Sequence, residues 1–462
     1  MKKKNFTSKV LFFNAVSLSM ITVFIIVSAG CGSSGGADGN SPTDPTGKEI
    51  IYLPQEPEKQ RDNSPNISEY KWQTLVEDNT NFALEFYDNI AFGNSDNIFF
   101  SPYSISMTLA MAYAGAKNST EGQMADALNF NLSQDCLHTA FNYLDTELAS
   151  RGDIQEKNSN EPQKFNLTVD NSLWGQTDYN FTDQFLEVLA FNYGAGLKLL
   201  NFSKYPEDSR VTINDWISEQ TKGNIENLIQ KGAISSDTRF VLTNTIYFNV
   251  SWEIPFKTED TQQAKFNLPD GTQNVSMMSK KHDFKYTEGN GYKAVELKYY
   301  GDDLSMLIIL PDTGRFEEFE NSLDYFKLEL ILDNLKEESV ELKMPKFSYK
   351  SGTVSLKETF KDMGMQDPFK SCGNFPNSEC SDFSGMDGTR DLFISDIAHK
   401  AFISVDEEGT EAGAVTSFPG PGSSDYTITL TIDRPFIFFI RDTKTEAILF
   451  MGRIMNPDFY KL

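Results

Sequence analysis

Residues 407–416 place the tightest constraint on how this chain can fold. They read Glu-Glu-Gly-Thr-Glu-Ala-Gly-Ala-Val-Thr, without an aromatic side chain and without a charge after Glu411. Side chains alternate between the two faces of a strand, so one face would carry only small residues: Thr410, Ala412, Ala414 and Thr416. Neither face could anchor a core. The pattern predicts a segment that can slide between two existing strands of a sheet without steric clash.

Blocks typical of one protein family surround this segment in that family's order, from about Trp72 to Pro457. They are residues 97–105, 107–113, 214–223, 242–248, 304–311, 344–347, 382–386, 399–402, 434–441 and 450–453. The ordered set resembles the serpins, and residues 408–416 resemble the hinge of the serpin reactive-centre loop. The resemblance implies an α+β fold, with three β-sheets surrounded by eight or nine α-helices and an exposed reactive-centre loop.

Hydrophobic periodicity by itself also indicates mixed α and β structure. It predicts helices at 81–91, 104–114, 137–148 and 182–193. It predicts strands at 242–248, 293–298, 305–310, 340–344, 392–395, 427–432, 436–440 and 447–453. Because no long internal linker interrupts the chain, we expect residues 69–462 to form one domain.

The amino terminus resembles an export signal. Lys2 to Lys4 precede a mostly apolar run over 10–29, so we expect residues 1–30 to be a signal peptide. Cys31 follows small residues and resembles an acylated lipoprotein cysteine, which predicts a membrane-anchored protein at the cell envelope or surface. The alternatives are an ordinary secretory peptide or an uncleaved anchor. Residues 31–68 are rich in Gly, Ser, Pro and acidic residues and are predicted to form a flexible tether.

Charge and motif content exclude several functions. A net charge of −25 argues against nucleic acid or an anionic membrane surface as partner. The chain has only 3 His and lacks the serine-hydrolase, zinc-protease and phosphate-loop patterns, and Asp382-Phe-Ser384-Gly lacks the first glycine of a nucleophile elbow. We therefore expect neither an enzyme nor a cofactor or metal site.

The resemblance assigns roles to single residues. It implies a shutter beneath the main sheet at Ser101, Ser104, Asn244 and His399, and a breach, where the loop first enters the sheet, at Trp252. It implies a hinge made of Glu408, Gly409, Thr410, Glu411, Ala412, Gly413, Ala414, Val415 and Thr416. Counting along the loop puts the reactive bond between Ser423 and Ser424, or between Ser424 and Asp425.

These roles imply a monomeric inhibitor that captures a serine protease covalently as a suicide substrate. A small serine before the cut favours elastase-like or subtilisin-like targets. Pro419 and Pro421 lack a donor for a sheet ladder, so we expect slower insertion rather than failed insertion. The alternative is a non-inhibitory serpin that acts as a binding or carrier module at the cell surface.

Three cysteines remain after Cys31. Cys372 and Cys380 bracket a short insertion, and an exported location would permit a disulfide between them; the alternative is two free thiols. Cys136 precedes a predicted helix and is expected to be a buried single thiol.

Overall fold

The computed structural model describes residues 60–151, 165–194, 197–221, 223, 225–301, 303–351, 354–373, 380–410 and 427–458. All of them belong to one compact unit, residues 51–462. Its chain contacts begin before the expected domain start at residue 69. Arg61 donates to Asn142 Oδ1 at 2.9 Å, and the Asp62 N–H donates to the Phe191 carbonyl at 3.0 Å. The last residues of the predicted tether therefore pack against the domain.

Helices precede most strands along the chain. They are α1 (Glu69–Ala91), α2 (Pro102–Tyr113), α3 (Asn118–Leu128), α4 (Gln134–Ser150), α5 (Asp183–Tyr193), α6 (Pro206–Gln220), α7 (Phe316–Glu320), α8 (Tyr325–Asp333), α9 (Lys357–Asp362) and α10 (Ser384–Asp387). Ser101 begins α2, because its hydroxyl accepts the Ser104 N–H and Pro102 follows at the first helical position. The helices predicted at 81–91 and 137–148 lie within α1 and α4, and those at 104–114 and 182–193 overlap α2 and α5, each with one residue beyond the helix.

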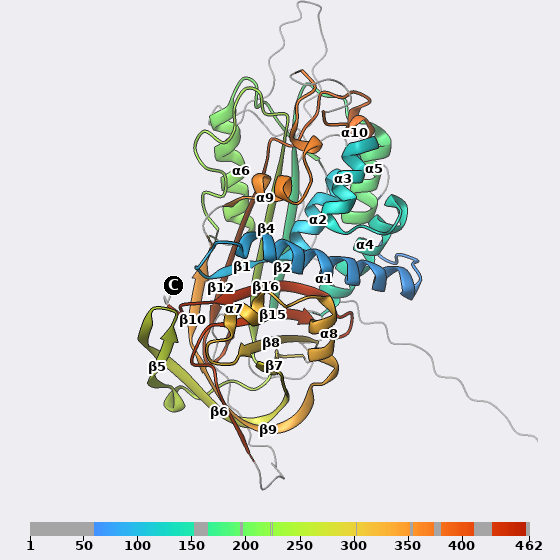
Figure 1. Cartoon of the computed structure of the whole chain (residues 1–462). Coiled ribbons are helices and arrows are strands. Elements are labelled where there is room, and N and C mark those ends of the chain that lie inside the picture. The colour runs from blue at the N-terminus through green and yellow to red at the C-terminus, as the bar shows by residue number, and fades with distance from the viewer. Residues whose placement is uncertain are drawn as a thin grey trace, which may run out of the picture. The chain divides into compact units, whose positions relative to one another are not determined.

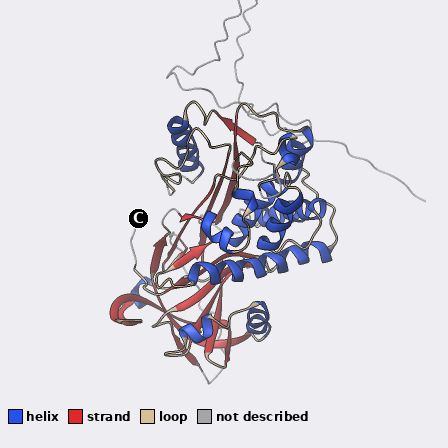
Figure 2. Cartoon of the chain, turned by 45° about the horizontal axis from the view of Figure 1, so that its top comes forward, coloured by secondary structure: helices blue, strands red, loops and turns tan. Residues whose placement is uncertain are grey.

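A seven-stranded sheet carries the segment of interest. Its order is β10-β12-β13-β4-β2-β3, and β11 pairs with β12. The strands are β2 (Phe165–Gln176), β3 (Leu197–Leu200), β4 (Phe240–Ser251), β10 (Phe347–Lys350), β11 (Val354–Ser355), β12 (Asp396–Val405) and β13 (Gly409–Thr410). Helices α2 to α5 gather beside the long strands of this sheet (Figures 1 and 2).

A nine-stranded sheet has the order β1-β16-β15-β8-β7-β6-β9-β14, and β5 pairs with β6. Its strands are β1 (Ile98–Phe100), β5 (Gln262–Leu268), β6 (Gly271–Gly289), β7 (Tyr292–Lys298), β8 (Leu304–Pro311), β9 (Lys336–Pro345), β14 (Ile428–Thr431), β15 (Phe436–Asp442) and β16 (Ile448–Ile454). In the described part of the chain, hydrogen bonding thus gives two sheets where three were expected. The reason is β6, whose 19 residues pair with β5 at one end and β7 at the other.

The strand predicted at 392–395 is wrong, because β12 begins only at Asp396. Leu392 and Ile394 are fully buried, so the alternation in the sequence reports burial correctly. Their backbone does not join a ladder: the Ile394 N–H donates to the Pro368 carbonyl, which lies in a short 3₁₀ turn. The other predicted strands lie within or overlap β4, β7, β8, β9, β14, β15 and β16.

Candidate functional site

The strand pair β4 and β12 is closed at one end and open at the other. The two strands pair directly in parallel from Asp396 opposite Val241 to Ala401 opposite Ile246. Beyond this stretch β13 lies between them and runs antiparallel to both. Thr410 faces Val405 on β12 and Val250 on β4. We call this open end, made of 250–251, 405 and 409–410, the fork.

Only small residues fit inside the fork. Thr410 is fully buried, and its hydroxyl lies 2.9 Å from the hydroxyl of Tyr299. A Cβ added to Gly409 would lie 2.4 Å from the Val250 carbonyl oxygen, closer than real Cβ atoms approach. The hinge therefore starts with residues whose size matches the space between two strands.

The turn that leads into the fork is held by main-chain and indole hydrogen bonds. The Trp252 N–H donates to the Glu408 carbonyl at 2.8 Å, and its indole Nε1 donates to the Asp406 carbonyl at 3.0 Å. The Phe256 N–H donates to the Glu407 carbonyl at 2.7 Å. The backbone carbonyls of this turn do not bond to a neighbouring strand, so these hydrogen bonds supply their partners. Trp252 also stacks on the Tyr299 ring, with centroids 4.6 Å apart.

The Glu407 side chain anchors the same turn. Its carboxylate accepts from Lys346 Nζ at 2.6 Å and from Thr261 Oγ1 at 2.8 Å. Burial alone would raise the pKa of Glu407, but these hydrogen bonds outweigh it and the pKa is lowered. We call Trp252, Phe256, Thr261 and Lys346 the clamp.

A polar cluster lies at the closed end of the strand pair. The Asn244 side-chain nitrogen lies 2.5 Å from Ser104 Oγ, 2.9 Å from Thr108 Oγ1 and 2.8 Å from Asn171 Oδ1, and its two hydrogens are shared among these three oxygens. The Asn244 side-chain oxygen lies 2.8 Å from His399 Nδ1. The cluster thus ties β4 to β12, to β2 and to helix α2. Ser101 extends it, since its hydroxyl donates to the Leu449 carbonyl on β16 at 2.7 Å.

His399 is neutral in this cluster. Burial lowers its pKa from 6.5 to about 4. Because the Asn244 oxygen can only accept, His399 Nδ1 carries the proton and donates. The other nitrogen, Nε2, is buried and has no hydrogen-bond partner among the described residues. Protonation of His399 would therefore place an uncompensated charge inside the domain.

Those predicted shutter, breach and hinge residues that the structure describes fall into two groups. Ser101, Ser104, Asn244 and His399 form the polar cluster, while Trp252, Glu408, Gly409 and Thr410 meet at the fork. The remaining hinge residues 411–416, the reactive-bond residues 423–425, and Cys31 with the leader lie outside the described residues. Sequence reasoning missed Tyr299, Phe256 and Lys346, whose roles arise only from contacts across the fold.

The cysteines differ in their surroundings. Cys372 and Cys380 are joined in a disulfide. Cys136 is half-exposed, so the expectation of a buried thiol is wrong. It lies in the first turn of α4, where Lys71 Nζ is 2.9 Å from its sulfur. A hydrogen bond from Lys71 lowers the pKa of this thiol.

The described residues contain neither a metal-binding cluster nor a membrane-spanning helix. No group of His, Cys, Asp and Glu side chains there is arranged to bind a metal ion. No helix in that part of the chain has both the length and the apolar character that a membrane crossing requires.

Known proteins match this chain along most of its length. The family model described as serpin (serine protease inhibitor) matches residues 77–457. An uncharacterised serpin-like protein of Thermococcus kodakarensis is 37% identical over 85% of this chain and 88% of its own. Leukocyte elastase inhibitor A of Mus musculus is 38% identical over 83% of this chain and 100% of its own. The structure of human thyroxine-binding globulin with thyroxine superimposes with a TM-score of 0.72 at 28% identity, covering 84% of this chain and 99% of that one.

Proposed function

Because the chain belongs to the serpin family of serine protease inhibitors, we propose that it captures a serine protease as a suicide substrate. The protease serine attacks one exposed peptide bond of the loop. An ester forms with the carbonyl carbon, and the C–N bond breaks to release a new amino terminus. The cut loop then enters the seven-stranded sheet and carries the protease away before water hydrolyses the ester, as in other inhibitory serpins, which are a known example of strand addition.

The observation that carries this proposal is the fork. Gly409 and Thr410 already occupy the position of a strand between β4 and β12. Residues 411–416 continue from Thr410 with small side chains on one face. If β13 were extended in the same direction, it would lie between β4 and the stretch of β12 that now pairs with β4 directly, Asp396 to Ala401. This geometry supports the fork as the entry point for insertion.

The energy of insertion is large enough for this task. A new strand between β4 and β12 exchanges one parallel ladder for two antiparallel ladders, so it adds about a dozen hydrogen bonds. At roughly 0.5–1.5 kcal/mol net each, the gain is on the order of 10 kcal/mol. Proteases, like other proteins, have stabilities of about 5–15 kcal/mol, so this gain can distort one.

We propose that the targets are elastase-like or subtilisin-like. Ser423 or Ser424 would precede the cut, and a small neutral side chain suits a small apolar specificity pocket. The name of the mouse relative, leukocyte elastase inhibitor A, supports a target of this class. A trypsin-like target would need Lys or Arg at this position.

We propose further that the protein is exported and acylated at Cys31. The basic, apolar and small-residue order before Cys31 supports this location. Expression of the full chain and of Cys31→Ala tests it. The acylated protein partitions into the membrane fraction and the variant does not; equal partitioning of the two forms would contradict acylation as the anchor.

A second candidate is a non-inhibitory serpin that carries a small molecule. The similarity to thyroxine-binding globulin, solved with bound thyroxine, favours this candidate. The small residues at the fork argue for inhibition instead, because a carrier needs no space for an entering strand.

One experiment separates the two candidates. The full chain is incubated with an elastase, a subtilisin, a chymotrypsin and a trypsin, followed by denaturing gels and mass spectrometry of the released peptide. Inhibition predicts a denaturant-resistant band at the summed mass and a peptide that begins at Ser424 or Asp425. Cleavage without a covalent band for all four proteases would overturn the proposal.

A further inference from the structure

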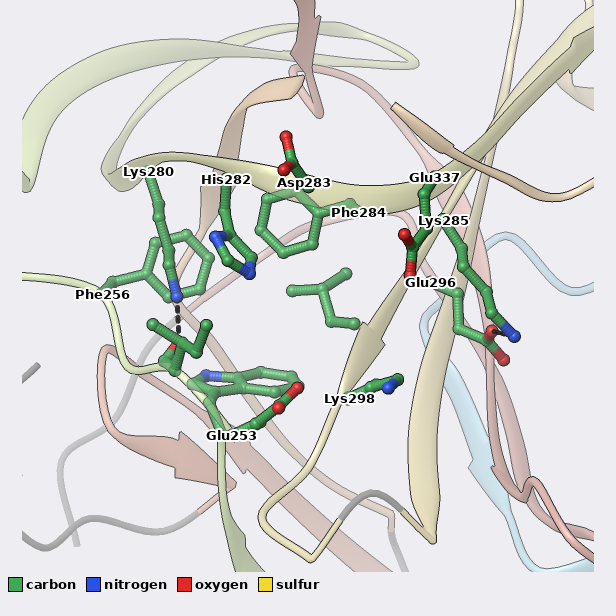
Figure 3. A pocket seen from close by; sticks show the side chains of 13 residues that line it. Glu253, Phe256, Lys280, His282, Asp283, Phe284, Lys285, Glu296, Lys298 and Glu337 are labelled. Atoms are coloured by element: carbon green, nitrogen blue, oxygen red, sulfur yellow. Dashed lines mark hydrogen bonds and ion pairs between the residues drawn. The ribbon is translucent and has the colours of Figure 1, made fainter. Parts of the chain in front are cut away.

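A cavity of about 220 Å³ lies directly behind the clamp. Its wall comes from four places: the segment after β4 with Trp252, Ile254 and Phe256, the middle of β6, the end of β7, and Glu337 at the start of β9 (Figure 3). The same Trp252 and Phe256 hold the carbonyls of the turn that leads into the fork. The cavity is therefore in contact with the residues that position the hinge.

Alternation along β6 gives the cavity its chemistry. Lys280, His282 and Phe284 share one face of the strand because they are two residues apart. Lys281 and Asp283 belong to the opposite face and are exposed. Trp252, Phe256, Phe284 and Leu297 supply an aromatic and apolar wall around the polar tips of Lys280 and His282. Such a mixture, apolar walls with a few polar groups, is typical of sites for small organic ligands.

Lys280 is an unusual group in this wall. Its ammonium donates to the Ile254 carbonyl and lies over the Phe256 ring, 5.7 Å from the centroid. Among the described residues no carboxylate forms an ion pair with it. Burial lowers its pKa from 10.5 to about 7. A carbonyl oxygen does not neutralise a cation. An anionic partner would therefore lower the free energy of the buried, protonated amine.

We propose that this cavity binds a small organic acid with one carboxylate and an aromatic or apolar body. The carboxylate pairs with Lys280, and the body packs against Trp252, Phe284 and Leu297. A single charge is specified because acidic side chains also line the cavity, namely Glu253, Asp283, Glu296 and Glu337. A phosphate with two charges would be repelled by them.

Binding has a consequence for the hinge, and this part rests on the proposed inhibitory function. A ligand against Trp252 and Phe256 braces them in the position in which they bind the carbonyls of Asp406, Glu407 and Glu408. It therefore favours the uncut form and slows loop insertion, because a ligand stabilises the state that binds it.

The charge of Lys280 also makes the affinity for the ligand depend on pH. The charged groups around Lys280 are Glu253 after β4, His282, Asp283 and Lys285 on β6, Glu296 and Lys298 on β7, and Glu337 on β9. Glu296 is already paired with Arg441 at 3.0 Å and with Lys285 at 3.4 Å. Since the ligand needs protonated Lys280, whose pKa is about 7, its affinity weakens about thirtyfold from pH 6 to pH 8.5.

Calorimetry of the uncut full chain with 4-phenylbutyrate, without any protease, tests the site. The matched probes are 4-phenylbutanol, which lacks the charge, and 4-phenylbutylamine, which reverses it. Lys280→Met removes the amine and keeps an apolar stem, Lys280→Arg keeps the charge, and Lys281→Met is the control on the opposite face of the same strand.

We expect the carboxylate to bind at least tenfold more tightly than the alcohol or the amine. Lys280→Met should lose this preference, whereas Lys280→Arg and Lys281→Met should retain it. Equal affinity for acid and alcohol, unchanged binding by Lys280→Met, or no binding of the acid would each overturn the site. Because no protease is present, these results stand whether or not the protein traps one; slower trapping at saturating ligand is measured separately and tests only the coupling.

Discussion

The two ends of one strand pair, β4 with β12, are held by different chemistry. At the fork a small buried Thr410 keeps the strands apart, and the clamp holds the turn that precedes it. At the closed end Asn244 and His399 hold the strands together through one hydrogen bond of 2.8 Å. Under the proposed mechanism, the fork receives the inserting strand and the closed end must give way to it.

The closed end resembles a latch because its bonds depend on direct pairing. Asn244 and His399 are register partners on neighbouring strands. A strand inserted between β4 and β12 would move these partners from about 4.8 Å to about twice that separation, measured along the hydrogen-bonding direction. The bond between His399 Nδ1 and Asn244 Oδ1 must then break. The cluster therefore resists opening without adding apolar surface that would make opening irreversible.

The largest effect on protease trapping is expected from a substitution that prevents the loop from entering the sheet at the fork. In Thr410→Arg a guanidinium would replace a fully buried hydroxyl and would have to be desolvated between two strands. We expect the loop to be cut as a substrate, with the trapped fraction of protease reduced at least tenfold. The measurement is the stoichiometry of inhibition with the protease that the wild type traps.

Thr410→Ser is the matched control for this change. It keeps a small hydroxyl that can reach Tyr299, so trapping should persist. Full trapping by Thr410→Arg would show that the fork is not the entry point for insertion.

The second effect concerns the latch. Asn244→Ala removes the group that bonds Ser104, Thr108, Asn171 and His399. It leaves His399 Nδ1 buried without its partner, whereas Ser104, Thr108 and Asn171 keep other hydrogen bonds. At about 1–3 kcal/mol for the unsatisfied buried group and about 0.5–1.5 kcal/mol for each further hydrogen bond lost, with partial relaxation, we expect a loss of about 3 kcal/mol in the free energy of unfolding. Chemical denaturation of the uncut protein measures it.

Asn334→Ala is the control, because Asn334 is exposed and its side chain donates to the Leu330 carbonyl near the end of α8. It should change the free energy of unfolding by less than about 0.5 kcal/mol. Similar losses in the two variants would mean that the polar cluster does not hold the strand pair closed.

The pH dependence of the free energy of unfolding tests the role of His399 in the latch. The folded pKa of His399, about 4, lies below its ordinary value of 6.5, so the neutral form stabilises the fold. This contribution is complete above pH 6.5 and is lost as the pH falls toward 4. At pH 5 the loss amounts to about 2 kcal/mol. His399→Gln, which does not titrate, should lose that much less stability than the wild type between pH 7.5 and pH 5.

His138 provides the internal comparison. Burial lowers its pKa to about 3, but it lies in α4 and contacts Tyr193 rather than the strand pair. Its titration should destabilise the fold without speeding loop insertion. If the pH dependence of the insertion rate follows His138→Gln rather than His399→Gln, the latch assignment fails.

The fork and the latch could be predicted from the sequence only because the serpin-like blocks occur in the order typical of that family. Small residues after Gly409 can be seen in the chain, and so can the apolar alternation around His399. The clamp could not be seen, because Phe256, Thr261 and Lys346 are ordinary residues whose partners lie about 60 to 150 positions away. Their function exists only after the two sheets have packed.

Two local errors have the same origin. Residues 392–395 alternate like a strand, yet their backbone bonds go to loop carbonyls and a strand end. Cys136 adjoins a predicted helix, yet it falls in the first turn of α4, on the side that Lys71 can reach. Periodicity reports which side chains are buried or lie on a helix, and it does not report which backbone groups or neighbours meet them.

The smallest effect is expected from Lys346→Met, which tests whether anchoring of the turn before the hinge is needed for the loop to enter the sheet. Lys346→Met removes the cation that pairs with Glu407 and leaves Thr261 as a donor to the carboxylate. The two side chains are 17% and 8% exposed, so the pair is partly screened, and we expect a loss of about 1 kcal/mol at pH 7. Lys343→Met removes a more exposed pair with Glu341 on the same stretch of chain and should cost almost nothing. Because the fork itself is intact, Lys346→Met should still trap protease; loss of trapping would mean that the turn, and not the space between the strands, limits insertion.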